Sequence, residues 1–266
     1  MCLHILVGTV LCLGNRVSRG ADWHGQAAGK RVIRWWAQRF CRIVGLRVHA
    51  YGQAGTMPAM LAVNHISWLD IVGLLSLQPA LFVSKASVRQ WPVIGSLASL
   101  AGTIFLHRRG LSVLPQAVDS ISSHLKQDRF VAVFPEGTTT NGERVGVFHA
   151  ALFQAAVDAR REVYPVALRY IRDGRRDMLA PFIGEQGFLP HLLRIMAVPE
   201  TRLELTFCSP IDACTMDRRS LAACARNSIR QSLGELGREE VRSVPSNHAS
   251  PSYATKQPAF NDIFSS

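Results

Sequence analysis

Short apolar runs of β type alternate along the chain with segments whose apolar residues recur every three or four positions. The short runs predict strands at Met60–Val63, Leu81–Ser84, Thr103–Leu106, Phe130–Phe134, Val163–Leu168 and Arg202–Phe207. The periodic segments predict helices at Trp68–Leu77, Val93–Leu100, Val113–Gln127, Phe148–Ala159 and Arg218–Leu236. Alternation of strands and helices is typical of an α/β fold, in which helices cover a central sheet.

The segment Val32–Val48 has the pattern of a basic amphipathic helix. Its apolar residues recur at three- and four-residue steps and include Trp35 and Trp36, whereas arginines fill other positions. Such a helix either lies in the headgroup layer of a membrane or packs against its own domain, and the sequence leaves both interpretations open.

A second apolar segment, Ile5–Leu13, lies nearer the start of the chain. It is shorter than the roughly 20 residues that span a bilayer, and no Lys or Arg precedes it as in a signal peptide. We interpret it either as part of a membrane-dipping helix or as an ordinary apolar segment. In the first case the basic residues that follow would face the cytoplasm.

The chain has few charged residues, and basic residues outnumber acidic ones. Charged residues make up 18% of the 266 residues and hydrophobic residues 48%, which excludes a disordered protein. The net charge is +11, of which +7 lies in residues 1–50. An anionic partner is therefore expected, and a membrane surface is favoured because no nucleic-acid-binding module is recognisable.

The chain shows no internal repeat and no interior linker, so we predict one main domain. It comprises residues 48–242, preceded by a membrane-associated helical region at 1–47. Residues 243–266 are rich in Pro, Ser, Asn and Thr and are predicted to form a disordered tail. The six cysteines and nine histidines have no ligand-type spacing, so no metal site is expected.

A first polar cluster, Asn64–Asp70, follows the predicted strand Met60–Val63. On one continuous helix His65 and Asp70 would point about 140° apart, so they meet only if His65 lies in the turn before the helix. Ser67 is the predicted N-cap of that helix. Asp70 would then hold one imidazole nitrogen and leave the other to act as a base. A purely structural link between loop and helix is the alternative.

A second polar cluster, Phe134–Thr140, follows the predicted strand Phe130–Phe134. The Glu136 side chain and the amides of Gly137 and Thr138 are suited to a hydroxyl-rich or phosphate-bearing headgroup. The alternative is an ordinary turn, for which the same residue types are typical.

A third and weaker cluster lies at the end of the run Gly102–Arg109, which carries His107 and Arg108. A guanidinium such as that of Arg108 is suited to binding a phosphate. A solvated basic strand end is the alternative interpretation.

Together these clusters resemble the motifs of the lysophospholipid and glycerolphosphate acyltransferase family, which includes bacterial 1-acyl-glycerol-3-phosphate acyltransferases. The matching runs, in order, are Asn64–Asp70 with its His-x4-Asp pattern, Gly102–Arg108, Phe134–Thr138 and Val163–Val166. A His-x4-Asp pattern alone is common, but its combination with Phe-Pro-Glu-Gly-Thr about 70 residues later is specific. The resemblance covers roughly residues 30–210.

The resemblance implies a glycerolphosphate-acyltransferase-like single domain at residues 48–242, with a central mixed sheet flanked by helices, plus N-terminal membrane-associated helices. It implies an acyl transfer in which His65, held by Asp70, deprotonates a hydroxyl of a lysolipid, which then attacks an acyl thioester. The phosphatidate-forming reaction on 1-acyl-sn-glycerol-3-phosphate, a step of phospholipid biosynthesis, is the expected activity.

The resemblance also assigns residues to the two substrates. Arg108, Glu136, Gly137 and Thr138 are implied in binding the acceptor. Lys85 resembles a lysine placed near the thioester oxygen, and a surface lysine is the alternative for it.

Two positions depart from the pattern of family members that act on glycerol phosphates. This chain has His107 where they often carry Asp and Thr139 where they often carry Arg. The runs Trp91–Gly95 and Glu136–Thr140 also resemble the branch that acylates lyso-ornithine lipid. Lyso-ornithine lipid is therefore the alternative acceptor.

No cofactor is expected, because the acyl donor is a co-substrate, either acyl-carrier protein or coenzyme A thioester. No acyl-enzyme is expected either, since the chain has no Gly-x-Ser-x-Gly elbow and no cysteine in a matching motif. The expected location is the cytoplasmic face of a bacterial inner membrane. Two rival hypotheses are a thioesterase-like hydrolase that uses the same His-Asp pair on water, and a non-catalytic basic membrane-binding protein.

Overall fold

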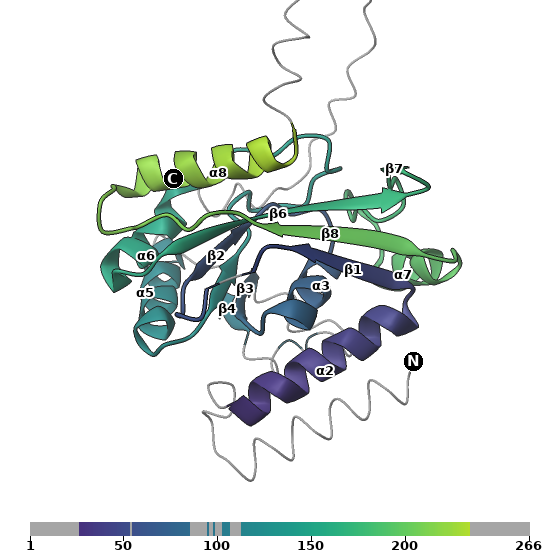
Figure 1. The fold of residues 1–266 in the computed structure, drawn as a ribbon, viewed down its shortest axis with the longest axis horizontal. Coiled ribbons are helices and arrows are strands. Elements are labelled where there is room, and N and C mark those ends of the chain that lie inside the picture. Colours follow the sequence, from purple (N-terminus) through teal and green to yellow (C-terminus); the bar gives the residue numbers. More distant parts are fainter. Residues whose placement is uncertain are drawn as a thin grey trace, which may run out of the picture.

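The computed structural model describes residues 27–53, 55–85, 95, 98, 103–106 and 113–234 (Figure 1). Strands and helices alternate along most of this range, so the predicted α/β class is confirmed. The helices are α2 (Ala27–Ile43), α3 (Leu69–Leu77), α5 (Val113–Lys126), the 3₁₀ turn η3 (Ala150–Phe153), α6 (Gln154–Ala159), α7 (Phe188–Met196) and α8 (Arg218–Ser232). The strands are β1 (Leu46–Tyr51), β2 (Met60–Val63), β3 (Leu81–Lys85), β4 (Ile104–Leu106), β5 (Val131–Val133), β6 (Val163–Arg172), β7 (Arg175–Arg176) and β8 (Thr201–Phe207).

These strands form one mixed sheet in the order β1-β8-β6-β2-β5-β3-β4, with β7 paired to β6. β8 runs antiparallel to β6, whereas β2 is parallel to both of its neighbours, β5 and β6. The carboxyl ends of β2 and β5 therefore lie at the same edge of the sheet, where α/β proteins place their sites. The polar clusters that follow these two strands in the sequence start side by side.

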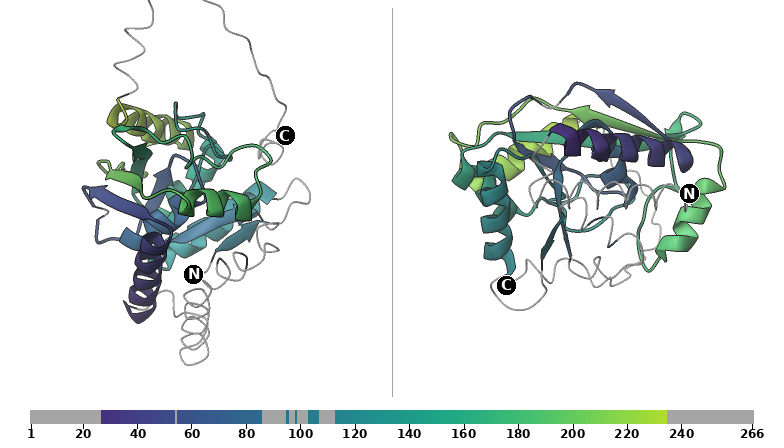
Figure 2. Two further views of the ribbon diagram at one scale, coloured as in Figure 1. Left: turned by 90° about the vertical axis from the view of Figure 1, so that its right-hand side faces the viewer. Right: turned by 90° about the horizontal axis from the view of Figure 1, so that it is seen from below.

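Helices cover both faces of the sheet (Figures 1 and 2). On one face, α2, α3 and α7 pack against β1 and β8 through buried side chains that include Phe40, Leu74, Leu192 and Leu203. On the other face, α5, α6 and α8 pack against the sheet through buried side chains that include Ile121, Phe153, Leu221 and Ile229. The central strand β2 is buried on both faces, as its continuous apolar run predicts.

The N-terminal amphipathic helix ends earlier than its periodicity predicts. The pattern predicts a helix to Val48, but α2 ends at Ile43 and β1 begins at Leu46. Gly45 has a positive φ of 73°, a conformation that commonly ends a helix and that glycine adopts without strain. Leu46 and Val48, which extend the helical pattern, instead belong to a strand paired in parallel with β8.

One face of α2 packs on its own domain, which was one of the two interpretations of this helix. Ile33, Ala37 and Phe40 are buried there, and α2 packs against α3. Its opposite face is exposed and basic, as the pattern indicates: the exposed residues include Arg31, Arg34, Trp35, Arg39 and Arg42. No helix in the described ranges is both long and apolar enough to cross a bilayer.

Three elements are absent from the sequence predictions: β1, β7 and α7. α7 contains Pro190 in its first turn, where proline is tolerated because that N–H has no partner within the helix. The predicted helix Phe148–Ala159 is divided into η3 and α6. The segment Ile5–Leu13, the tail at 243–266 and most of the predicted helix Val93–Leu100 lie outside the described residues.

Gly73 allows α3 to lie close to β8. A Cβ at this position would overlap a methyl group of Leu203, which is fully buried. We expect Gly73→Ala to lower the free energy of unfolding by about 1–3 kcal/mol through overpacking, despite a gain of up to ~1 kcal/mol in helix propensity. Urea denaturation measures the difference.

The control for this prediction is the same change in a Leu203→Ala background. The overlap is then removed, so Gly73→Ala should be neutral or stabilising there. An equal loss in both backgrounds would contradict the proposed overlap.

Candidate active site

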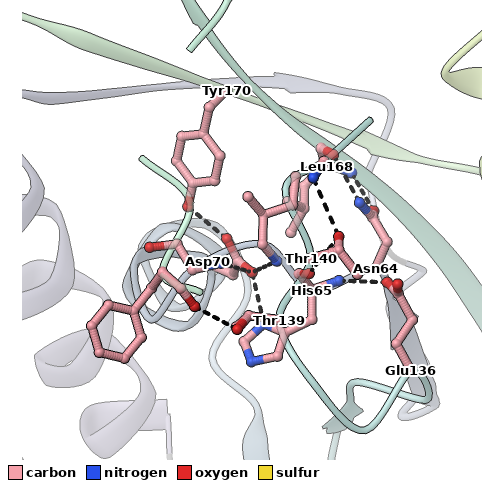
Figure 3. Close-up of polar contacts among 12 residues, drawn as sticks. Asn64, His65, Asp70, Glu136, Thr139, Thr140, Leu168 and Tyr170 are labelled. Atoms are coloured by element: carbon pink, nitrogen blue, oxygen red, sulfur yellow. Dashed lines mark hydrogen bonds and ion pairs between the residues drawn. The ribbon is translucent and has the colours of Figure 1, made fainter. Parts of the chain in front are cut away.

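The loop between β2 and α3 begins with a side chain that continues the sheet pairing. β2 pairs with β6 as far as Val63 and Val166. The next residue, Asn64, is buried; its amide nitrogen donates to the carbonyl of Leu168 at 3.0 Å, and its amide oxygen accepts from the Leu168 N–H at 2.8 Å (Figure 3). This pair of bonds fixes the point at which the chain leaves the sheet.

His65 lies in the turn before α3, and Asp70 lies in the first turn of that helix. His65 Nδ1 and Asp70 Oδ2 are 2.8 Å apart. The geometry predicted for the His-x4-Asp pattern is thus confirmed. Residues five positions apart meet because the chain changes direction between them.

Asp70 is fully buried and accepts three further hydrogen bonds. The backbone N–H groups of Ile66 and Ser67 donate to Oδ2 at 2.7 and 2.9 Å, and the hydroxyl of Tyr170 donates to Oδ1 at 2.6 Å. A buried charge is costly unless it is hydrogen-bonded, and here both carboxylate oxygens have donors.

The prediction that Ser67 is the N-cap is wrong. α3 begins at Leu69, with Trp68 at the cap position and no side-chain cap bond. The Ser67 hydroxyl is buried and has no hydrogen-bond partner within the described ranges. Asp70 instead binds the amides that precede the helix, and its carboxylate lies near the helix N-terminus, where the helix dipole favours negative charge.

Tyr170 is a site residue that the sequence analysis missed. It lies in β6, one hundred positions from Asp70 in the chain, and it is buried. Burial and the neighbouring Asp70 carboxylate raise the pKa of Tyr170 well above its ordinary value, so the hydroxyl stays protonated and donates. The sequence offers one hint of this role, a tyrosine within an apolar strand. The contact itself could not be read from the sequence, because the pairing of β2 with β6 brings Tyr170 to Asp70.

The second polar cluster holds the main chain of His65 from both sides (Figure 3). The His65 N–H donates to Glu136 Oε1 at 2.8 Å. The His65 carbonyl accepts from the N–H of Thr140 at 2.8 Å and from its hydroxyl at 3.1 Å. The second Glu136 oxygen accepts from the N–H of Gly146 at 2.8 Å. The two clusters predicted from sequence therefore form one structural unit.

Glu136 is buried, and this burial raises the pKa of its carboxyl group above the ordinary value. Gly137 adopts a positive φ of 70° in a turn where its N–H donates to the carbonyl of Phe134 at 3.0 Å. Thr138 is half-buried. The described contacts thus show Glu136 binding the loop, while acceptor binding by Glu136, Gly137 and Thr138 stays a prediction.

The imidazole of His65 is fixed on one side and accessible on the other. Its ring stacks on that of Phe134, with centroids 3.8 Å apart and planes 16° apart. The side chain is 18% exposed. Nε2 points away from Asp70 in Figure 3 and has no hydrogen-bond partner among the described residues. This nitrogen is therefore available to a substrate.

Two predicted site residues are placed only in part. Lys85 is the last residue of β3, and its backbone pairs in register with Leu106 of β4. Its side chain and the whole of Arg108 lie outside the described residues. Within the described ranges, no group of three or more His, Cys, Asp or Glu side chains is arranged to hold a metal ion.

α7 packs directly against the loop that carries His65. The indole Nε1–H of Trp68 donates to Nδ1 of His191 at 3.0 Å, and His191 Nε2 lies 3.1 Å from the carbonyl of Leu179. Trp68 also contacts Phe188 edge-on, with ring centroids 4.9 Å apart. His191 must therefore be the neutral tautomer with its hydrogen on Nε2.

A model of the family described as Acyltransferase matches residues 46–169, which include both polar clusters. The lyso-ornithine lipid O-acyltransferase of Pseudomonas aeruginosa is 40% identical over 204 residues, 77% of this chain and 79% of that protein. The chain belongs to the acyltransferase family. The resemblance inferred from the motifs is thus confirmed.

Two further proteins similar to this acyltransferase are named for the acylation of 1-acyl-sn-glycerol-3-phosphate. The 1-acyl-sn-glycerol-3-phosphate acyltransferase of Neisseria gonorrhoeae is 31% identical over 188 residues, 70% of this chain and 74% of that protein. The crystal structure of the 1-acyl-sn-glycerophosphate (LPA) acyltransferase PlsC from Thermotoga maritima matches 83% of this chain and 84% of its own, with a TM-score of 0.56 and 19% identity. That likeness supports the glycerolphosphate-acyltransferase-like fold.

We expect Tyr170→Phe to lower the free energy of unfolding of the acyltransferase by about 1–3 kcal/mol, because the buried Asp70 carboxylate loses one of its donors. Chemical denaturation followed by circular dichroism measures the loss. Tyr51→Phe is the control, since Tyr51 is 47% exposed, and surface changes usually cost less than about 0.5 kcal/mol. Equal stability of Tyr170→Phe and the parent protein would contradict the role given to this bond.

His191 predicts a pH dependence of stability. Burial lowers its pKa below the ordinary value of 6.5, and protonation of Nδ1 would also remove the acceptor of the Trp68 bond. The stabilisation from neutral His191 is therefore complete above pH 6.5 and is lost as the pH falls through the lowered pKa.

We accordingly expect the stability difference between the parent protein and His191→Gln to narrow as the pH falls from about 8 to about 5. Urea denaturation at a series of pH values measures this difference, and groups that titrate in both proteins cancel. A difference that stays constant or widens on acidification would contradict the assignment of a neutral His191.

Proposed function

We propose that this chain transfers a fatty acyl group from a thioester to the free hydroxyl of a lysolipid, with His65 as the general base. The observation that carries this proposal is the 2.8 Å contact between His65 Nδ1 and the buried Asp70. A carboxylate at this position keeps the hydrogen on Nδ1, so Nε2 presents its lone pair to the substrate.

The chemistry requires one proton transfer in each direction. His65 Nε2 takes the hydroxyl proton as the oxygen attacks the thioester carbonyl, and a C–O bond forms. Asp70 stays ionised and stabilises the resulting imidazolium. The tetrahedral intermediate then expels the thiolate with cleavage of the C–S bond, and the imidazolium returns the proton to the departing sulfur.

The contacts around His65 support this role because they pre-organise the base. Glu136 and Thr140 bind its backbone N–H and carbonyl, and Phe134 stacks on its ring. A base fixed in this way needs little reorganisation when the substrate arrives.

Direct transfer is favoured over a covalent acyl-enzyme. Burial raises the pKa of the Cys41 thiol to about 12, and burial also raises the pKa of Cys208. A thiol with a raised pKa is a weak nucleophile at neutral pH. These two cysteines therefore do not suit a covalent step.

Lyso-ornithine lipid is the acceptor that we favour, on two grounds. The relative that is 40% identical is named for this lipid. In addition, Thr139 occupies the position where family members that act on glycerol phosphates often carry Arg, and its hydroxyl donates to the carbonyl of Phe182. That position therefore offers no cation to a phosphate.

1-Acyl-sn-glycerol-3-phosphate, which would give phosphatidate in phospholipid biosynthesis, is the second candidate acceptor. It is favoured by the 31% identical relative from Neisseria gonorrhoeae. For either acceptor, Arg108, Glu136, Gly137 and Thr138 are the proposed binding residues. Lys85 is the proposed partner of the thioester oxygen, and the donor is acyl-carrier protein or coenzyme A thioester.

The outer face of α2 supports an anionic membrane surface as a partner. It exposes Arg31, Arg34, Arg39 and Arg42, and the helix contains no acidic residue. The guanidinium of Arg39 lies 5.8 Å from the ring centroid of Trp35. Exposed arginines beside a tryptophan suit the headgroup layer of an anionic leaflet. We therefore propose that the enzyme acts at the cytoplasmic face of a bacterial inner membrane.

The test is an acceptor panel with the purified full chain. Lyso-ornithine lipid, lysophosphatidate and other lysophospholipids are each offered with acyl-carrier protein and coenzyme A thioesters, and the diacyl product is measured. We expect His65→Ala to reduce product formation about 10²-fold or more. His49→Ala, which alters an exposed histidine of β1, should leave it unchanged.

Two outcomes would reject the proposal. If no acceptor is acylated in a His65-dependent way, the enzyme is not a lysolipid acyltransferase. If His65-dependent release of free fatty acid occurs without a diacyl product, the thioesterase-like hypothesis replaces it.

A further inference from the structure

α7 carries apolar side chains on its exposed face as well as on its buried face. His191, Leu192 and Ile195 are buried against the domain. On the opposite side, Leu189 is 58% exposed, Leu193 is 55% exposed and Met196 is 38% exposed. A surface helix of a soluble domain normally presents polar residues to water, so this outer face calls for an apolar environment.

Large exposed apolar side chains are concentrated in this part of the molecule. Of the nine in the described ranges, four lie in residues 178–196. The fourth is Met178, which is 66% exposed. It precedes Leu179, whose carbonyl lies 3.1 Å from His191 Nε2 of α7. Single exposed apolar residues are common on proteins, whereas a cluster of them indicates a contact surface.

The position of α7 relates this cluster to the catalytic loop. The first turn of α7 contacts Trp68, which lies between His65 and Asp70 in the sequence, through Phe188 and His191. A molecule resting on the outer face of α7 would thus be close to the loop that carries His65.

α7 itself is basic, while the exposed Glu185 precedes it and the exposed Glu200, which follows it, is ion-paired with Arg47 at 3.1 Å. α7 carries Arg194, which is exposed, and contains no acidic residue. The segment that follows α7 joins the end of α2, because the N–H of Thr201 donates to the carbonyl of Gly45 at 2.9 Å. The last turn of α2 carries Arg42, also exposed. An apolar helix face flanked by arginines is complementary to an anionic lipid leaflet.

We propose that the outer face of α7, formed by Leu189, Leu193 and Met196, docks on the bilayer leaflet that contains the lysolipid acceptor. This inference rests on the proposed function, because a lysolipid must pass from a leaflet to His65. The apolar side chains enter the boundary between headgroups and acyl chains, as in helices that lie in the membrane interface. Arg194 remains at the level of the lipid phosphates.

The test measures binding of the full chain to vesicles of phosphatidylethanolamine and phosphatidylglycerol by flotation. We expect Leu189→Ser combined with Leu193→Ser to weaken binding about tenfold or more, because two apolar contacts with the leaflet are lost. Met57→Ser is the matched control: Met57 is 61% exposed and precedes β2, at the end of that strand away from His65. It should bind as the parent protein does.

A second measurement separates docking from folding and from chemistry. Acyl transfer to lysolipid embedded in vesicles should fall in parallel with binding in the double variant. Transfer to a short-chain lysolipid dissolved as monomers should be unchanged, which also shows that the variant is folded. If the parent protein acylates neither acceptor, the proposed function fails, and flotation still decides whether α7 docks.

Three results would overturn the docking proposal. The first is full vesicle binding by the double variant. The second is a parent protein that dimerises in solution and a double variant that does not, which would assign the face to a second copy of the chain. The third is loss of binding to acyl-carrier protein with vesicle binding retained, which would assign the face to the donor.

Discussion

The buried carboxylate of Asp70 is the constraint on which the site depends. A charge removed from water requires compensation by several hydrogen bonds, and Asp70 accepts four, from His65, Ile66, Ser67 and Tyr170. These donors come from one loop and from the neighbouring strand β6. The position of the His65 ring is therefore coupled to the pairing of β2 with β6, and a shift of that register would remove the Tyr170 donor from the buried carboxylate.

The polar backbone groups of the loop are likewise satisfied by hydrogen bonds. Asn64 replaces one step of strand pairing, Glu136 binds the N–H of His65, and Thr140 binds its carbonyl. Two motifs that lie about 70 residues apart in the chain thus form one rigid unit at the carboxyl edge of a parallel strand pair. This explains why they are informative together: Glu136 and Thr140 of the second motif satisfy the backbone groups of His65 in the first, and the imidazole remains open on one side.

Much of this could be predicted from the sequence, and the exceptions have physical causes. The α/β class and the meeting of His65 with Asp70 follow from local periodicity and from the spacing of two residues. Tyr170 could not be predicted, because its contact depends on strand register rather than on spacing. Serine is a common N-cap residue, which is why the sequence predicts that Ser67 caps α3. In the structure Asp70 instead accepts hydrogen bonds from the amides that precede the helix. β1 escaped prediction because Leu46 and Val48 also fit the period of the preceding helix, which Gly45 ends.

Asp70 holds His65 with its hydrogen on Nδ1 and its lone pair on Nε2, and nitrogen NMR of the folded, ¹⁵N-histidine-labelled protein tests this arrangement most directly. His65→Gln assigns the signals of the ring. We expect the neutral imidazole of His65 to carry its hydrogen on Nδ1, with Nε2 unprotonated. A hydrogen on Nε2 would contradict this arrangement, because the nitrogen that faces the substrate would then be unable to accept a proton.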